Sequence, residues 1–325
     1  MALRYRPELD GLRAIAIFAV MGFHFARPLA TGGSFGVDIF FVLSGYLITS
    51  ILLGQAEEGG IRYGAFLARR ARRLLPALFL LLAVYVALGP ILWPQFANRR
   101  WLDAATAAFY VTNLRETFWP ADTPLSHTWS LAIEEQFYIG WPLVIGLLSR
   151  LSRRRAVQLL VAAWAVLTVA RWGWETAWPA HASAYYFTPL HATGLLLGSA
   201  LAFRPWPIRW GGGALAALGL LIVAGHSTQG FVLQTPVAEL LAALVLTDPP
   251  RLLAAAPLRF VGRISYGAYL WHIPIAWAFD FPANFVAAAG LMALSLAAGA
   301  GSHYGLERWF LVGRSGRPAP AGAPA

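Results

Sequence analysis

Residues Leu9 to Phe25 have the sequence LDGLRAIAIFAVMGFHF, an apolar run that carries two basic side chains, Arg13 and His24. These positions are eleven residues apart, close to three turns of an α-helix, so a helix places both side chains on one stripe about 16 Å apart along its axis. A charged side chain at the centre of a bilayer costs about 2.5 to 3.5 kcal/mol. We therefore expect this helix to turn its polar stripe toward other helices or a wet cavity.

Composition places the chain among polytopic membrane proteins. Of its 325 residues, 58% are hydrophobic and 12% are charged, and the mean hydropathy is +0.58. Soluble proteins average about 45–50% apolar and 25% charged residues. Cysteine is absent, which excludes a disulfide scaffold, a thiolate nucleophile and a cysteine-ligated metal. A covalent acyl carrier on this protein would have to be a histidine or a serine.

The charge pattern indicates how the helices are oriented in the membrane. The net charge is +10, and all 25 Lys and Arg positions are arginine, in short runs between apolar segments. Cytoplasmic loops of membrane proteins carry an excess of such residues. We therefore place most arginines in the cytoplasm and expect no nucleic-acid partner. This orientation leaves a few arginines outside or at the outer interface: Arg27, Arg99, Arg100, Arg115 and Arg171.

The sequence predicts an all-α, multi-pass membrane protein with about ten transmembrane helices and cytoplasmic N- and C-termini. The apolar segment 101–118 would be an eleventh span, but it would move the basic run 150–155 outside, so we interpret it as interfacial or re-entrant. We expect a membrane-embedded domain over residues 1–312 and a disordered Pro/Ala/Gly-rich tail over 313–325. The expected spans are 12–29, 36–53, 74–93, 127–148, 156–172, 187–203, 211–226, 236–247, 262–280 and 284–306.

A second polar stretch, GGSFGVDIFFVLSGY at residues 32–46, closes the first outer loop and opens the second span. Asp38 lies at the start of that helix, where a carboxylate can simply stabilise the helix N-terminus. The loop is too short to separate the two helices far, so we also expect Asp38 near His24. A carboxylate beside an imidazole can fix its tautomer and raise its basicity.

Two further stretches lie at the ends of later spans. The basic run RRARRLLP at residues 69–76 either anchors the third span at the cytoplasmic face or binds phosphate groups, which arginine pairs with bidentately. The string HTWSLAIEEQFYIGWP at residues 127–142 places His127, Ser130 and Glu134 on one helix face. Glu134 either holds the bundle together through Arg13 or another arginine, or orients a catalytic group.

The last distinctive stretch is GRISYGAYLWHIP at residues 262–274, where His272 falls near the middle of a span. A lone histidine in an aromatic-rich helix is more often a hydrogen-bonded structural group than a catalyst. His181, His191, His226 and His303 belong to no recognisable motif, and we expect them to be structural.

In order, these five stretches resemble the motifs of the membrane-bound acyltransferase-3 family. The family has an Asp-Gly-x-Arg entry whose arginine is followed after ten residues by a histidine, a Gly-Gly loop with Phe-x-x-Ser-Gly-Phe/Tyr, and a basic run. It also has His-x-Trp-Ser-Leu-x-x-Glu-x-Gln-Phe-Tyr and Ser-Tyr-Gly-x-Tyr-Leu-x-His. The resemblance implies an enzyme of the bacterial cytoplasmic (inner) membrane that moves an acyl group, commonly acetyl, from cytoplasmic acyl-CoA to a hydroxyl of an envelope carbohydrate, a glycolipid or a sugar-bearing small molecule.

The resemblance also implies site residues. His24, Arg13, Asp38 and Glu134 are expected to be catalytic, with His24 as general base or transient acyl carrier and the two acids orienting it. Arg13, Arg69, Arg70 and Arg73 are expected to bind the acyl-CoA donor. Substrate contacts are expected from His127, Ser130 and His272.

Other functions stay open at this stage. Intramembrane Arg, His, Asp and Glu also suit a proton-coupled transporter or a flippase of a glycolipid or sugar, although the internal repeats typical of transporters are absent from the sequence. A scaffold for another envelope enzyme is a third possibility. We expect no metal and no permanently bound cofactor, and we expect any second transfer step to need a separate extracytoplasmic partner enzyme.

Overall fold

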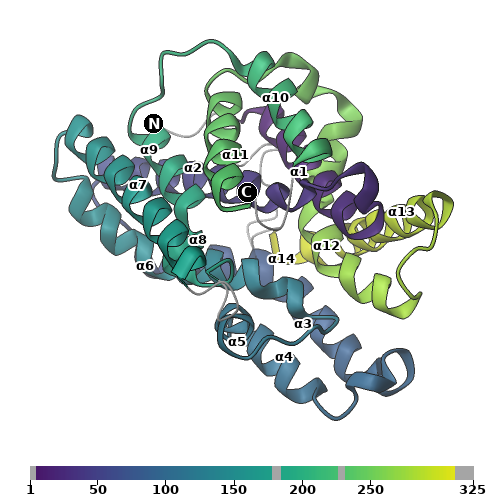
Figure 1. Cartoon of the computed structure of the whole chain (residues 1–325). Helices are drawn as coiled ribbons and strands as arrows, with labels where there is room; N and C mark the ends of the chain where they lie inside the picture. Colours follow the sequence, from purple (N-terminus) through teal and green to yellow (C-terminus); the bar gives the residue numbers. More distant parts are fainter. Residues whose placement is uncertain (1–4, 178–183, 226–230, 312–325) are drawn as a thin grey trace.

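The structure is a computed structural model, and it describes residues 5–177, 184–225 and 231–311 (Figure 1). Within these ranges the regular structure is entirely helical. The α-helices are α1 (Pro7–Phe25), α2 (Gly36–Glu57), α3 (Tyr63–Leu92), α4 (Arg100–Ala108), α5 (Thr112–Phe118), α6 (Trp129–Leu148), α7 (Arg153–Ala177), α8 (Thr188–His191), α9 (Thr193–Phe203), α10 (Gly211–Ala224), α11 (Phe231–Thr247), α12 (Ala256–Ala278), α13 (Phe285–Ser302) and α14 (Arg308–Leu311).

Short helical turns connect several of these elements. The 3₁₀ turns are η1 (Arg27–Leu29), η2 (Gly33–Phe35), η3 (Pro94–Phe96), η4 (Ser126–Thr128) and η5 (Arg251–Ala254). A π-helical segment, η6 (His303–Glu307), continues α13 into α14. The predicted tail, residues 313–325, lies outside the described residues.

The helices agree with the expected spans in position. Each of the ten predicted spans overlaps at least one α-helix. Five stretches of the described residues are long and apolar enough to cross a bilayer, namely Gly33–Glu57, Tyr63–Leu92, Ser126–Leu148, Arg153–Ala177 and Phe285–Phe310. Shorter apolar helices are Thr193–Phe203, Gly211–Ala224 and Leu233–Thr247. The all-α membrane character is thus confirmed, whereas the count of ten spans and the cytoplasmic termini stay predictions.

The apolar segment 101–118 does not form one long helix. It is divided between α4, with nine residues, and α5, with seven. Between them Tyr110 adopts a φ of 54°, a left-handed conformation that ends helices. At 1.5 Å per residue neither helix reaches across the roughly 30 Å hydrocarbon core of a bilayer.

Close backbone contact brings α1 and α12 together. A Cβ atom built on Gly262 of α12 would lie 1.9 Å from the Asp10 carbonyl oxygen of α1, so only glycine fits there. Helix α2 packs on α9 in the same way, because a Cβ on Gly198 would lie 2.0 Å from the Val42 carbonyl oxygen. Small residues that let backbones approach are typical of helix contacts in membranes. These contacts fix α1, α2, α9 and α12 as the central helices of the bundle.

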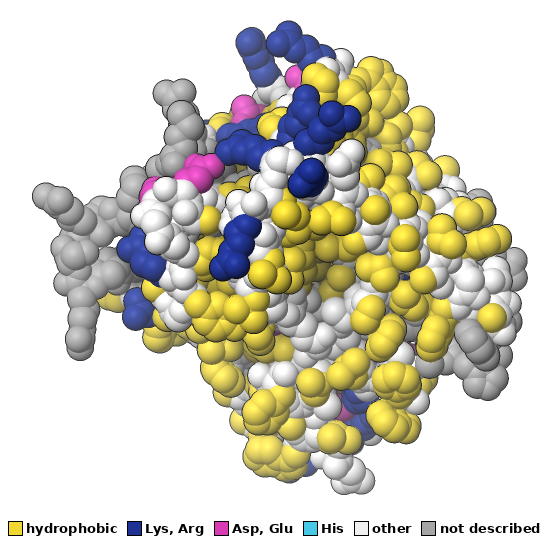
Figure 2. All heavy atoms as spheres, turned by 90° about the vertical axis from the view of Figure 1, so that its left-hand side faces the viewer, with side chains coloured by type: hydrophobic (Ala, Val, Ile, Leu, Met, Phe, Trp, Pro, Cys, Tyr) yellow, Lys and Arg dark blue, Asp and Glu magenta, His cyan; other side chains and the backbone are white. Residues whose placement is uncertain are grey.

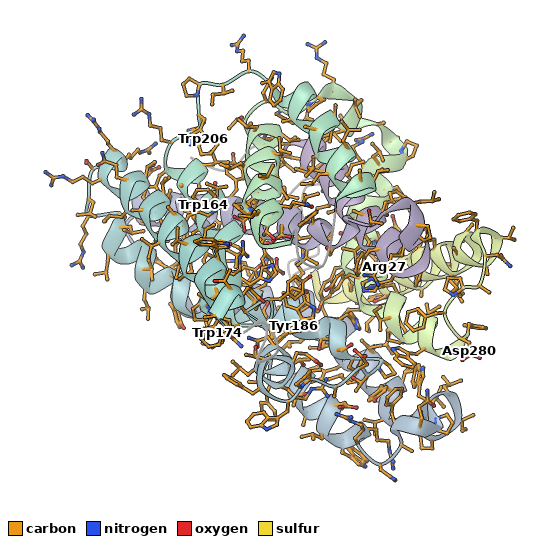
Figure 3. All side chains as sticks on the ribbon, in the orientation of Figure 1. Arg27, Trp164, Trp174, Tyr186, Trp206 and Asp280 are labelled. Atoms are coloured by element: carbon orange, nitrogen blue, oxygen red, sulfur yellow. The ribbon has the colours of Figure 1, made fainter. Side chains whose placement is uncertain are left out.

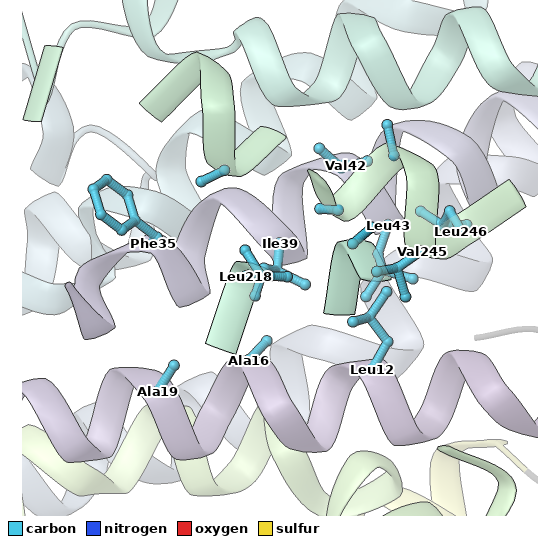
Figure 4. Close-up of a cluster of buried hydrophobic side chains, with 14 of the residues drawn as sticks. Leu12, Ala16, Ala19, Phe35, Ile39, Val42, Leu43, Leu218, Val245 and Leu246 are labelled. Carbon is cyan, nitrogen blue, oxygen red and sulfur yellow. The ribbon is translucent and has the colours of Figure 1, made fainter. Parts of the chain in front are cut away.

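An apolar cluster between α1, α2, α10 and α11 fills the space beside these contacts (Figure 4). Lipid tails are as apolar as these side chains, so close van der Waals packing rather than transfer from water holds the helices together in a membrane. The labelled members of the cluster are Leu12, Ala16, Ala19, Phe35, Ile39, Val42, Leu43, Leu218, Val245 and Leu246.

The molecular surface has the polarity of a membrane protein. Figure 2 shows arginine side chains gathered mainly near the top of one face, above a broad area of hydrophobic side chains. Helix α7, for example, exposes apolar side chains at Leu159, Val166 and Val169. Exposed apolar residues on a long helix suit contact with lipid. The buried polar residues discussed below lie behind this apolar surface.

Candidate active site

Three imidazole rings meet where α1, α12 and η4 converge. The ring of His272 lies between those of His24 and His127, with centroid distances of 5.1 Å and 5.2 Å. His24 is half-buried near the end of α1, His127 is 5% exposed and His272 is fully buried. The sequence placed His127 and His272 among the substrate-contacting residues but gave no indication that they surround His24.

Backbone carbonyl groups fix the proton positions on these rings. The Nδ1 atom of His24 lies 2.9 Å from the Val20 carbonyl oxygen. A carbonyl oxygen only accepts hydrogen bonds, so this Nδ1 carries the proton and donates it, and Nε2 keeps the lone pair in the neutral ring. His272 donates from Nδ1 to the Tyr269 carbonyl at 2.6 Å, and its Nε2 has no hydrogen-bond partner in the described part of the chain. The ring of His24 therefore has a basic nitrogen that the protein leaves free for chemistry.

His24 and His127 line a cavity of about 600 Å³. Aromatic side chains form much of its wall, including Trp129, Tyr186 and Trp277. Small-molecule sites in proteins measure about 300 to 1,000 Å³. His272 does not line the cavity; its imidazole lies behind that of His24, which does. Figure 3 shows the labelled Arg27 at the α1 end of this region and Tyr186 on the segment that precedes α8.

Ser130 lies behind the wall of the cavity and does not face its interior. Its hydroxyl lies 2.6 Å from the Tyr269 hydroxyl, and the Tyr269 hydroxyl in turn donates to the His127 carbonyl oxygen at 2.9 Å. Ser130 is buried and is not among the cavity-lining residues. The structure therefore assigns Ser130 to positioning Tyr269 and His127, whereas the sequence suggested direct substrate contact.

A second polar region surrounds Arg13, below the imidazoles on the same stripe of α1. Three guanidinium groups lie close enough to act on one another electrostatically, those of Arg13, Arg70 and Arg73. Arg70 also lies over the Tyr138 ring, 4.2 Å from its centroid, in cation–π geometry. Three cations in one half-buried region need anions to balance them. Such a region is suited to bind phosphate groups.

The basic run on α3 is divided between two helix faces. Arg70 and Arg73, three residues apart, are half-buried and face the Arg13 region, whereas Arg69 and Arg72 are exposed. Residues three apart share a helix face, so the alternation follows from helix geometry. The structure thus groups Arg13, Arg70 and Arg73 and separates Arg69 from them.

Glu134 belongs to the guanidinium region and not to the imidazoles. Its Oε1 atom accepts a hydrogen bond from the Ser44 hydroxyl at 2.6 Å, and the charges of Arg70 and Arg13 act on it. The expectation that Glu134 orients His24 is therefore not supported by the contacts, because the Val20 carbonyl holds that ring. The alternative, in which Glu134 faces Arg13 and another arginine, describes its position.

Asp38 also has a partner other than the expected one. Its Oδ1 atom lies 3.1 Å from Nε2 of His191, and both side chains are buried. The expectation that Asp38 holds the His24 imidazole is therefore wrong, because Asp38 contacts His191 and the Val20 carbonyl holds His24. The short first loop brings α1 and α2 together, but Asp38 projects toward α8. His191, which we expected to be merely structural, is thus the residue that holds this carboxylate.

Sequence reasoning also missed a buried charge on α7. Arg171, expected outside or at the interface, is 0% exposed, and none of its guanidinium nitrogens has a hydrogen-bond partner among the described residues. The charge of Arg171 acts on Glu239 of α11, as does that of Asp38. Glu239 accepts hydrogen bonds from the Thr193 hydroxyl at 2.5 Å and the Trp164 indole at 2.6 Å. An arginine inside an apolar span was the available signal.

The described residues contain no cluster of side chains that could bind a metal ion. No group of three or more His, Asp or Glu side chains in the ranges 5–177, 184–225 and 231–311 is arranged to hold a metal ion. The two polar regions are instead an imidazole group beside a cavity and a guanidinium group with carboxylates. Their chemistry is that of proton transfer and anion binding.

The apolar helical bundle indicates an integral membrane protein. Its buried ionisable groups, and the cavity beside a free imidazole nitrogen, indicate a binding or catalytic site inside it. The chain belongs to the acyltransferase-3 family, because the model of that family, described as an acyltransferase domain, matches residues 6–302. The resemblance seen in the five sequence stretches is therefore confirmed. No solved structure matches the chain.

Curated relatives point the same way. The chain is 33% identical over 308 residues to the peptidoglycan O-acetyltransferase OatA of Listeria monocytogenes, covering 84% of this chain and 49% of that protein. It is 36% identical over 319 residues to the putative peptidoglycan O-acetyltransferase YrhL of Bacillus subtilis, with coverage of 84% and 49%. It is 34% identical over 307 residues to the O-acetyltransferase OatA of Staphylococcus aureus, with coverage of 84% and 51%. The chain therefore spans about half the length of these relatives.

Proposed function

We propose that this protein is a membrane O-acyltransferase of the bacterial cytoplasmic membrane that moves an acetyl group from acetyl-CoA to a carbohydrate hydroxyl. The observation that carries the proposal is the free Nε2 of His24 at the edge of a cavity. It is supported by membership of an acyltransferase family and by relatives that are named O-acetyltransferases.

The donor site in this proposal is the guanidinium region. Arg13, Arg70 and Arg73 pair with the phosphates of acyl-CoA, and Glu134 keeps the three cations in place when the donor is absent. Arg13 and His24 are separated by about 16 Å along α1. The flexible pantetheine arm of the donor extends along this stripe and brings the thioester from the phosphate site toward the imidazoles. Coenzyme A is thus a co-substrate and not a resident cofactor.

The transfer step uses the lone pair of His24. As the acceptor hydroxyl attacks the thioester carbonyl, Nε2 takes the hydroxyl proton, an ester bond forms and the carbon–sulfur bond breaks. The departing thiolate of coenzyme A then takes a proton from the imidazolium. In the second version of this chemistry Nε2 attacks the thioester carbonyl, the carbon–sulfur bond breaks and the thiolate of coenzyme A leaves. The acceptor hydroxyl then attacks the acetyl-imidazolium, the carbon–nitrogen bond breaks, and the hydroxyl proton passes to the thiolate. Both versions require the same tautomer of His24.

The experiment is transfer of radiolabelled acetyl from acetyl-CoA to envelope glycans in membranes that contain this chain. We expect label in the glycan fraction with the intact protein and none with His24→Ala. Phe18→Ala is the matched control, since Phe18 is an exposed residue of the same helix, and it should retain transfer. Membrane insertion is checked for each variant by extraction and thermal unfolding.

Two results would contradict the proposal. Full transfer by a folded His24→Ala protein would remove His24 from the chemistry. Absence of transfer by the intact, folded protein with acetyl, propionyl and longer donors would instead favour the transporter or flippase interpretation, which uses buried ionisable groups as a proton relay.

A further inference from the structure

The cavity beside His24 has a distinctive charge. Three carboxylates line it, Glu116 of α5, Asp122 of the following loop and Glu175 near the end of α7. No arginine lines the cavity among the described residues, and the chain contains no lysine. Arg115 pairs with Glu116 and with Asp103, whereas Asp122 and Glu175 have no ion pair in the part of the chain that the structure describes. The cavity is therefore net negative.

The same cavity offers aromatic rings at close spacing. The Trp129 ring lies 4.7 Å from that of Tyr185 and 5.3 Å from that of Tyr186, measured between centroids. Burial and the carboxylates of Glu116 and Asp122 raise the pKa of Tyr186 to about 12, so its hydroxyl stays protonated and can donate a hydrogen bond. Rings with polar edges offer both an apolar face and a donor.

One hydroxyl on the wall has no hydrogen-bond partner among the residues that the structure describes. Ser34 lines the cavity and is 8% exposed, and its Oγ atom makes no hydrogen bond. A buried hydroxyl without a partner loses its hydrogen bonds to water and gains none in return. A ligand that offers a hydroxyl or a carbonyl group at this position would supply the missing bond.

These features together select a kind of ligand. A pyranose ring has an apolar C–H face that stacks on aromatic rings and a rim of hydroxyls that donate to carboxylates and to Ser34. A ligand carboxylate or phosphate would enter a net-negative, partly water-excluded space, where repulsion between like charges is stronger than in water. Among the described residues, no arginine lines the cavity to compensate for this repulsion.

We propose that this cavity is the acceptor site and that Asp122 and Glu175, with Glu116, restrict the acceptor to an uncharged sugar by repelling sugars that carry an acid group. The inference rests on the proposed function, because an acceptor site beside His24 presupposes transfer to a hydroxyl. It goes further by naming the residues that set the charge of the acceptor.

The test compares two ligands that differ only in charge, methyl β-glucuronide and its primary amide, at pH 7. Dissociation constants for the full chain in detergent are measured by saturation-transfer NMR, which needs no acyl transfer. We expect the amide to bind at least about tenfold more tightly than the acid. Raising the salt concentration should narrow this ratio, because salt screens the exposed carboxylates.

Variants identify the residues responsible. Asp122→Asn with Glu175→Gln should bring the ratio below about threefold, mainly by improving binding of the acid. Glu57→Gln is the matched control, since Glu57 is an exposed acid paired with Arg153 outside the cavity, and it should leave the ratio unchanged. Asp122 and Glu175 are preferred to Glu116 as targets because Glu116 is buried and ion-paired, so its loss could unfold the protein.

Three results would overturn the inference: equal binding of acid and amide, binding of neither ligand, or a ratio that the double substitution leaves unchanged. The proposed function is judged separately, by release of coenzyme A and by labelled product. Selective binding of the amide without any acetyl transfer would support the charge selection while contradicting the proposed function. Acetyl transfer together with equal binding of the acid and the amide would support the proposed function while contradicting the charge selection.

Discussion

Asp38 of α2 and His191 of α8 form a buried carboxylate–imidazole contact between two helices. Nδ1 of His191 donates to the Tyr185 carbonyl, so Nε2 faces the Asp38 Oδ1 atom, 3.1 Å away. Because the Tyr185 and Trp129 rings pack on His191, this pair supports the wall of the cavity from behind.

Substitutions in this pair should therefore act mainly on stability. Leaving a buried polar group without its partner costs about 1 to 3 kcal/mol, so Asp38→Asn and His191→Gln should each lower the midpoint of thermal unfolding in detergent. The double substitution should cost less than the sum of the two, because neither group is then left without its partner. Additive losses would contradict a direct interaction between the two residues.

The two faces of the basic run on α3 predict different effects on donor binding. Arg70→Ala and Arg73→Ala should each raise KM for acetyl-CoA roughly 10- to 100-fold, since a hydrogen bond to a charged group contributes about 1.5 to 3 kcal/mol. Arg72→Ala should have little effect, because Arg72 is exposed on the other face. The measurement is initial rate against donor concentration. Equal effects at all three positions would mean that general positive charge, and not a defined site, attracts the donor.

His272 is expected to assist His24. Its unpartnered Nε2 lies on a ring next to that of His24, and it can stabilise the proton that His24 takes up. His272→Phe keeps an aromatic ring but loses the nitrogen, so kcat should fall about 100-fold or more while KM for the donor stays the same. Trp271→Phe, at the neighbouring position, serves as control. Normal kcat for His272→Phe would restrict this histidine to packing.

The contact between α2 and α9 can be tested with matched glycines. Gly198→Ala places a Cβ atom 2.0 Å from the Val42 carbonyl oxygen and should destabilise the protein by about 1 to 3 kcal/mol or more, as overpacking does. On α6, a Cβ at Gly140 meets nothing within 4 Å, so Gly140→Ala should be neutral or stabilising by up to about 1 kcal/mol. Unfolding midpoints of the two variants give the comparison. A similar response in both would contradict the tight packing of α2 on α9.

Local patterns in the sequence predicted much of this structure. Hydrophobic runs located the helices, and helical spacing placed Arg13 and His24 on one stripe of α1, because both depend only on neighbouring residues. The basic run on α3, by contrast, was interpreted as one group, whereas the structure separates Arg69 from Arg70 and Arg73. Residues 101–118 were expected not to span, and the helix break at Tyr110 agrees with this.

Partners between distant helices could not be predicted in the same way. Asp38 was expected beside His24 because α1 and α2 are consecutive, yet the rotation of α2 about its own axis turns it to His191, 153 residues away. The electrostatic effect of Arg171 on Glu239 likewise depends on which faces of α7 and α11 approach each other. A single sequence contains no direct record of these rotations, since each helix would satisfy its own hydrogen bonds in several orientations.

The contact of Gly262 with Asp10 has a consequence for how the protein is made. Helix α1 is synthesised first, but its backbone partner α12 begins only at Ala256. At about 5 to 20 residues per second, the ribosome needs roughly 10 to 45 s to bridge this interval. During that time the polar stripe of α1 must be shielded from lipid by the helices between α1 and α12 or by the insertion machinery. A chain interrupted before α12 would retain His24 and His127 but lack both the glycine contact and the imidazole of His272, which lies between them.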